Sequence, residues 1–227
     1  MTIAIATERA DTSLALRDDA TLVGEAREGS LASFTVLVRR HERTVYRVAL
    51  RLVGRSGGAE EVAQDTFLRA YRALGRFQGG DFRPWLLRIA INRAYDELRR
   101  RKRAPESLDE FAIKSAAAFE PNLTWTATAR QDDPIARTEQ QELGLLLRAA
   151  LARLPFDQRL AIILSDVQGY DYLEIAAITG VSYGTVKSRL SRARARLRAI
   201  LRGPLEQGGA HDYLPREWSQ PELCVAC

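Results

Sequence analysis

The segment TGVSYGTVKSRLSRARARLR, residues 179–198, concentrates side chains that bind anions. Arginine stands at every second position from 192 to 198, and no acid occurs from Lys187 to Arg202. Guanidinium groups and hydroxyls bind phosphate oxygens and the edges of bases, and a charge of one sign needs an anionic partner. The pattern therefore predicts nucleic-acid binding.

The apolar residues of this segment indicate the element that must position those side chains. They recur at three- and four-residue steps, which predicts an α-helix and not a strand. Before this helix, Gly180 can adopt a positive φ and Ser182 can cap, so a helix-turn-helix is expected whose second helix enters the major groove. The residues expected to contact DNA from that helix and its cap are Ser182, Tyr183, Thr185, Lys187, Ser188, Arg189, Ser191, Arg192 and Arg196.

The charge of the chain is unevenly distributed. The 227 residues sum to +5, but residues 34–103 carry +10, residues 143–202 carry +6, and residues 104–142 carry −5. Two basic blocks separated by an acidic strip indicate two contacts with nucleic acid and a tether between them. Apolar residues keep helical spacing in both blocks. We expect an all-α fold of two small helical domains joined by an extended acidic linker, plus a short C-terminal extension.

The first basic block is expected to form a helical bundle. Helices are predicted near 20–28, from 34 to a stop at Gly54, over 59–74, and from Pro84 to Arg103, with a loop at 76–82. On the last helix we expect an inward face, and beside that helix lies a group of aromatic residues. Such rings next to arginines can hold unpaired bases, and they fit a plain core equally well. The inward face is Ile89, Ile91, Tyr95 and Leu98, and the aromatic group is Phe77, Phe82 and Trp85.

Several classes of protein are not supported by the sequence. No apolar run is long enough for a membrane span and no secretion signal precedes the first block, so a cytoplasmic location is expected. No nucleophile–base pair, phosphate-binding glycine loop or carboxylate cluster indicates an enzyme or a cofactor. Cys224 and Cys227 form a CxxC, but with only the distant His211 they make an incomplete metal site, so none is predicted. A thiol oxidoreductase is the enzyme alternative.

Three segments resemble those of an extracytoplasmic function (ECF) sigma factor of the sigma-70 family. AEEVAQDTFLRAYRAL at 59–74 resembles the helix that grips the RNA polymerase clamp. FRPWLLRIAINRAYDELRRRKR at 82–103 resembles the segment that melts and reads the minus-10 element. LPFDQRLAIILSDVQGYDYLEIAAITGVSYGTVKSRLSRARARL resembles the reader of the minus-35 element. By this resemblance, the expected parts are a sigma-2-like domain at 20–103, a linker at 104–142, a sigma-4-like domain at 143–202 and an extension of unknown role at 203–227.

The resemblance also implies roles for individual residues. The expected polymerase-binding residues are Gln64, Asp65, Phe67, Leu68, Arg69 and Tyr71. The expected minus-10 contacts are Phe77, Gln78, Gly79, Gly80, Asp81, Phe82, Trp85, Arg88, Asn92, Arg93, Asp96, Arg99 and Arg100.

The implied partners are core RNA polymerase, through its beta-prime clamp and beta flap, and promoter DNA, double-stranded upstream and single-stranded at minus-10. An anti-sigma factor is also implied, and no membrane insertion is expected. The alternative is a stand-alone helix-turn-helix regulator. That class needs only the second block and leaves the arginine-rich helix of the first block unexplained.

Overall fold

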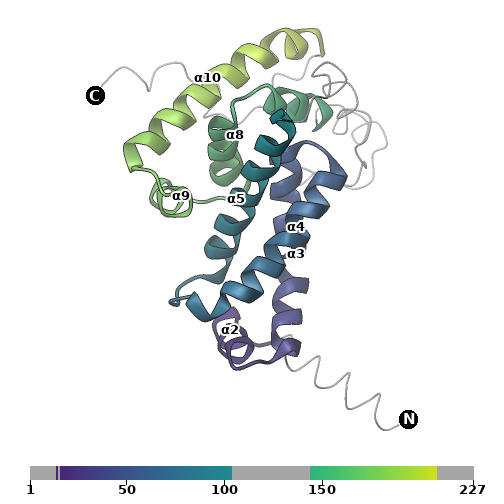
Figure 1. The fold of residues 1–227 in the computed structure, drawn as a ribbon. Helices are drawn as coiled ribbons and strands as arrows, with labels where there is room; N and C mark the ends of the chain where they lie inside the picture. Colours follow the sequence, from purple (N-terminus) through teal and green to yellow (C-terminus); the bar gives the residue numbers. More distant parts are fainter. Residues whose placement is uncertain (1–13, 15, 104–143, 209–227) are drawn as a thin grey trace, which may run out of the picture. The chain divides into compact units, whose positions relative to one another are not determined.

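The computed structural model describes residues 14, 16–103 and 144–208 of the chain. All regular elements in these ranges are helices, and the chain divides into two compact units, Met1–Pro105 and Glu106–Cys227 (Figure 1). The expected all-α, two-unit architecture is confirmed. The predicted linker at 104–142 and the weak metal candidates His211, Cys224 and Cys227 lie outside the described residues. Within the described ranges, no helix is long and apolar enough to span a membrane.

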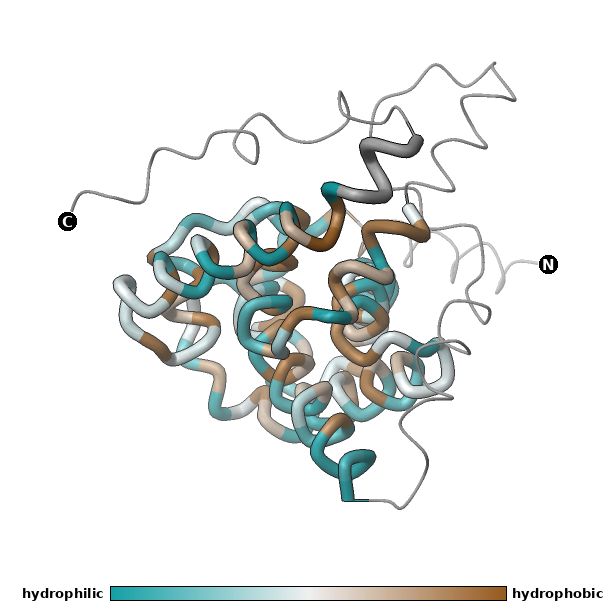
Figure 2. Tube along the Cα trace, turned by 90° about the horizontal axis from the view of Figure 1, so that it is seen from above, coloured by the Kyte–Doolittle hydropathy of each residue, from teal (hydrophilic) through white to brown (hydrophobic). Residues whose placement is uncertain are grey.

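Unit 1 is built from α2 (Asp19–Arg27), α3 (Leu31–Val53), α4 (Ser56–Ala73), a 3₁₀ turn (Leu74–Arg76) and α5 (Phe82–Arg103). The three long helices pack against one another, and α2 packs on α3. Figure 2 shows hydrophobic and hydrophilic residues alternating along the helices, as amphipathic helices in a bundle require. This bundle is the scaffold on which α4 and α5 present their outer faces.

Local signals set the ends of these helices. Ser30 caps α3 by accepting a hydrogen bond from the Ser33 N–H at 3.2 Å, and Gly54 ends α3 with a φ of 81°. At the start of α5, Asp81 accepts a hydrogen bond from the Arg83 N–H at 3.0 Å. Pro84 lies in the first turn of this helix. The sequence predicts these ends correctly to within a few residues.

One predicted orientation in unit 1 is wrong. Tyr95 was expected to face the bundle, but its side chain points outward and 45% of it is exposed. The buried face of α5 instead includes Leu87, Ile91, Ala94 and Glu97. No glutamate was predicted on the inward face of α5. The expected face therefore included Tyr95 and Leu98, each one residue after the observed inward positions 94 and 97.

Unit 2 consists of a helix at residues 144–152, α8 (Phe156–Ile162), a π-helical turn (Ile163–Val167), α9 (Tyr172–Thr179) and α10 (Tyr183–Gly208). Helix α9 opens with a capping box between Asp171 and Glu174 and ends at Gly180, whose φ is 71°. The expected helix-turn-helix is therefore present. Helix α10 runs to Gly208, past the expected boundary at residue 202.

Candidate nucleic-acid interface

Helix α10 is fixed to unit 2 by one apolar stripe. The stripe residues are at most 1% exposed, and they pack on a core that includes Ile162 and Ile175. The arginines at alternate positions therefore spread around the remaining surface of a helix, as the apolar period predicts. The stripe consists of Val186, Leu190, Ala193, Leu197 and Leu201.

The N-terminal half of α10 presents hydroxyl and basic side chains. Ser182 accepts a hydrogen bond from the Thr185 N–H at 3.2 Å, and the two hydroxyls lie 2.9 Å apart. The Tyr183 ring is 50% exposed and its centroid lies 5.8 Å from that of Tyr172. Among the expected DNA contacts, Ser182, Tyr183, Lys187, Arg192 and Arg196 are exposed, and Thr185, Ser188, Arg189 and Ser191 are half-buried.

Two arginines of α10 are tied to acids that precede it in unit 2. Arg189 pairs with Asp157 of α8 at 2.9 Å, and Arg194 pairs with Asp166 of the π-helical turn at 2.7 Å. Burial alone would lower the pKa of Arg194, but the hydrogen bond and the charge of Asp166 raise it above its ordinary value. Arg192 instead donates to Ser188 of its own helix. Lys187, Arg192 and Arg196 are the exposed cations of this surface among the expected contacts.

Helix α5 carries the second basic surface, on unit 1. The expected contacts that are exposed on it are Arg88, Asn92, Asp96, Arg99 and Arg100, while Arg93 and Trp85 are half-buried. Tyr95 is exposed among these residues, although the sequence did not predict it on this surface. The guanidinium carbon of Arg99 lies 5.7 Å from the centroid of the Tyr95 ring.

A buried carboxylate anchors the C-terminal part of α5. Glu97 is 1% exposed and pairs with Arg55 at 3.0 Å, Arg100 at 2.8 Å and Arg101 at 3.1 Å. Arg100 also reaches Glu61 of α4 at 3.2 Å. The hydrogen bond to Glu97 raises the pKa of Arg100 above its ordinary value. A buried charge needs such partners, so this network fixes where the basic end of α5 lies against α4.

Phe77 before α5 and Phe82 and Trp85 in its first turn form an aromatic cluster next to the loop at 77–81. Phe77 is 6% exposed and Phe82 is 2% exposed, and both rings pack against Trp85 at centroid distances of 5.1 and 5.5 Å. The side chains of Phe77 and Phe82 are thus buried in the unit, and their contacts with DNA stay a prediction. Between Phe77 and Phe82 in the chain, Gln78, Gly79, Gly80 and Asp81 are exposed, and both glycines have a positive φ, 93° and 91°.

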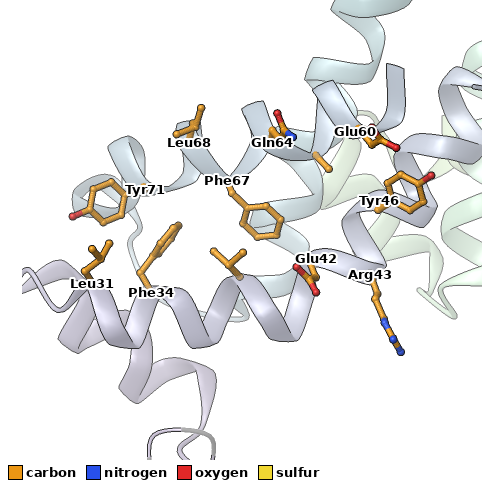
Figure 3. A pocket seen from close by; sticks show the side chains of 12 residues that line it. Leu31, Phe34, Glu42, Arg43, Tyr46, Glu60, Gln64, Phe67, Leu68 and Tyr71 are labelled. Carbon is orange, nitrogen blue, oxygen red and sulfur yellow. The ribbon is translucent and has the colours of Figure 1, made fainter. Parts of the chain in front are cut away.

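A groove lies between α3 and α4 of unit 1. Its volume is about 760 Å³, and Phe34 of α3 and Phe67 of α4 reach into it from opposite sides (Figure 3). We call it the α3–α4 groove. It is lined by Leu31, Phe34, Val38, Glu42, Arg43, Tyr46, Glu60, Ala63, Gln64, Phe67, Leu68 and Tyr71.

The structure separates the expected polymerase-binding residues into two groups. Gln64, Phe67, Leu68 and Tyr71 line the α3–α4 groove, with Leu68 55% exposed. Asp65 pairs with Arg93 of α5 at 2.6 Å, and Arg69 is exposed outside the lining. The α3 half of the groove was not predicted: Phe34 and Val38 were expected to lie on a helix but received no binding role, and Leu31 lies before the start predicted for that helix.

Comparisons with known proteins agree with this geometry. The family profile described as Sigma-70 region 2 matches residues 37–104, and the one described as Sigma-70, region 4 matches residues 144–197. The ECF RNA polymerase sigma factor SigM of Mycobacterium tuberculosis is 38% identical over 188 residues, which cover 82% of this chain and 85% of that relative. The ECF RNA polymerase sigma-E factor of Escherichia coli is 38% identical over 177 residues, 78% of this chain and 90% of the relative. SigE of Mycolicibacterium smegmatis is also 38% identical, but the matched part is 63% of its length.

Two solved structures resemble the chain. One is CnrH in complex with the cytosolic domain of CnrY, with a TM-score of 0.58, 28% identity, and coverage of 82% of this chain and 97% of that one. The other is the sigma factor RpoE in complex with the anti-sigma factor NepR from Bartonella quintana, with a TM-score of 0.55, 28% identity, and coverage of 76% and 98%. With both sigma-70 regions matched and a 38% identical relative covered over most of its length, the chain belongs to the ECF RNA polymerase sigma factors of the sigma-70 family.

Proposed function

We propose that this sigma factor binds core RNA polymerase through the α3–α4 groove and directs the enzyme to promoters with two separate recognition elements. Helix α10 reads the upstream, double-stranded element, while the loop at 77–81 and the outer face of α5 read and help to open the minus-10 element. Sigma factors are initiation factors, so the chain itself performs no covalent chemistry. The proposal includes a cytoplasmic location, where the polymerase works, and an anti-sigma partner like that of the RpoE–NepR complex.

The observation that carries the proposal is that one unit holds both the apolar α3–α4 groove and the basic helix α5. An apolar, open groove on a helical pair fits a protein partner, because a nucleic acid is bound by positive charge and stacking. Helix α4 contributes Phe67 and Leu68 to the groove and pairs Asp65 with α5 at 2.6 Å. One unit thus offers a protein-binding surface and a DNA-binding surface that share a helix.

The two basic helices, α10 and α5, carry side chains that suit different forms of DNA. The N-terminal half of α10 carries Lys187, Ser188 and Arg192, side chains that suit base edges and phosphates in a major groove. Asn92 on α5 and the glycine-bearing loop before it suit bases that have left the stack, because amide groups can pair with an exposed base edge. A stand-alone regulator would need the first surface only, so the groove and α5 weigh against it.

Run-off transcription with core polymerase on a pool of genomic fragments tests the proposal. We expect specific transcripts that require the chain. Leu68→Asp should reduce binding to core polymerase more than tenfold, about 1.4 kcal/mol or more, because a carboxylate in the groove would lose its water on docking. Arg72→Ala, an exposed change on the same helix outside the groove lining, is the matched control and should leave binding unchanged.

The same assay examines α10. Changing both Lys187 and Arg192 to alanine should weaken initiation at promoters that depend on the upstream element, with core binding intact. The proposal fails if wild-type chain and core polymerase do not associate, or if they associate and start no transcript. Unchanged transcription by the α10 double variant would remove only the assignment of that helix.

A further inference from the structure

We propose that Tyr95, supported by Arg99, is a stacking platform for an unpaired base of the opened promoter strand. The inference rests on the proposed function, because it assigns a specific contact to the minus-10 surface of α5. The sequence suggested base stacking only for Phe77, Phe82 and Trp85, and it predicted that Tyr95 faces the bundle.

The first support is the position of Tyr95 on α5. Arg88, Asn92, Tyr95 and Arg99 follow one another at steps of four, three and four residues, which places them on one face of a helix. All of them are exposed, and Tyr95 is 45% exposed. A large aromatic ring is therefore presented to solvent in the middle of a row of amide and guanidinium groups.

The second support is the cation beside the ring. The guanidinium carbon of Arg99 lies 5.7 Å from the ring centroid, within the range of a cation–π contact. The contact restrains the tyrosine side chain and puts a positive charge next to the ring. Surfaces that bind single strands combine a ring for the base and a cation for the backbone.

The third support is the position of the other aromatic rings near α5. Phe77 and Phe82 are 6% and 2% exposed, and half-buried Trp85 packs against both. Those rings hold the loop at 77–81 in place. Within unit 1 as the structure describes it, the other aromatic side chain with large exposure is Tyr71, whose ring lies 4.9 Å from that of Phe34 in the α3–α4 groove. Base stacking on α5 therefore falls to Tyr95.

The test uses holoenzyme assembled from core polymerase and the full chain, with Tyr95→Leu and Tyr95→Phe. Leucine keeps an apolar, helix-compatible side chain without a π face, and phenylalanine keeps the ring without the hydroxyl. One probe is a single-stranded oligonucleotide with the non-template sequence of the minus-10 region, taken from the strongest promoter in the run-off experiment. The other probe is the double-stranded upstream element of that promoter.

For Tyr95→Leu, affinity for the single strand should fall about 5- to 150-fold, the range that loss of one base–aromatic stack gives. Tyr95→Phe should bind it like the wild type, and both variants should bind the upstream duplex and core polymerase normally. Because the side chain is exposed, both variants should also keep the thermal unfolding profile of the wild type.

Each other outcome overturns the inference. Wild-type binding by Tyr95→Leu would show that no base stacks there, and an equal loss in Tyr95→Phe would show that the hydroxyl makes the contact instead. Weaker binding to core polymerase would show that the ring contacts protein. If the wild-type chain selects no promoter with core polymerase, the proposed function fails and the inference falls with it. If it selects promoters and Tyr95→Leu behaves normally, only the inference fails.

Discussion

Helices α5 and α10 are both long and rich in arginine, yet they differ in what they bury and what they expose. Helix α5 buries the charged Glu97 among its apolar residues and exposes the amide of Asn92 and the ring of Tyr95. Helix α10 buries an apolar stripe, carries half-buried hydroxyls next to the exposed Lys187, and exposes the ring of Tyr183 in its first turn. Charge density alone would predict the same target for both. The uncharged side chains between the cations distinguish the two surfaces. Those of α5 suit unpaired bases, and those of α10 suit a duplex.

The two helices also differ in how they are held in place. Helix α10 rests on side chains such as Leu190 and Leu197, while the basic end of α5 is fixed by ion pairs around one buried carboxylate. Removal of a buried apolar side chain leaves a cavity, whereas the arginines around Glu97 are partly exposed, so water can partly replace the carboxylate as their partner. Substitutions in α10's stripe should therefore be the most damaging.

The largest effect is expected from Leu190→Ala. The side chain is 1% exposed, so its truncation should cost about 2–5 kcal/mol of the free energy of unfolding of unit 2. Hydrogen exchange read by mass spectrometry should show faster exchange in peptides of α8 to α10 and unchanged exchange in α3 to α5. Lys187→Ala, on the exposed face of the same helix, is the control for stability. Equal protection of unit 2 in the wild type and in Leu190→Ala would mean that the stripe does not anchor α10.

A smaller loss is expected from Glu97→Ala in the other helix. The change leaves the guanidinium groups of Arg55 and Arg101 without their buried acceptor, at a cost of about 1–3 kcal/mol. Chemical denaturation should show this loss in unit 1, and Glu97→Gln, which keeps the acceptor oxygen, should lose less. A loss in Glu97→Ala as large as that of Leu190→Ala would remove the distinction between the two kinds of anchor.

The smallest change in stability, about 1 kcal/mol or less, is expected from Asp157→Asn, because the pair with Arg189 is half-exposed. Its effect on DNA binding should have the opposite sign. Arg189, no longer held by an acid, can reach a phosphate, so the salt dependence of binding to the upstream duplex should steepen by up to about one unit. Weaker binding would instead mean that Asp157 orients Arg189 toward the DNA.

The sequence was sufficient for features that depend on neighbours along the chain. Gly54 and Gly180 end their helices where a positive φ is needed, and the apolar period identified α10 despite its alternating arginines. Features that depend on two elements were not predictable in this way. The groove needs α3 and α4 together, and Phe34 has the same spacing whether it lies in a core or lines a groove.

The error at Tyr95 has a specific physical reason. A helix face can include either position 94 or position 95, and the larger apolar side chain was assigned inward. The structure places small Ala94 inside, fully buried, and gives the next inward position to Glu97, which pairs with three arginines. Without knowledge of Arg55, which comes from the connection between α3 and α4, no pattern within α5 predicts a buried acid.

The ion pair between Asp65 and Arg93 has a consequence for chimeric sigma factors. Asp65 lies on α4, which is proposed to bind the polymerase, and Arg93 lies on α5, which is proposed to bind the promoter. The Asp65 carboxylate and the Arg93 guanidinium lie 2.6 Å apart. A hybrid whose junction falls between residues 74 and 82 inherits one member from each parent. Parents with unlike residues at these positions would yield a hybrid with a mismatched contact at the boundary, so exchangeable cassettes should be cut after α5.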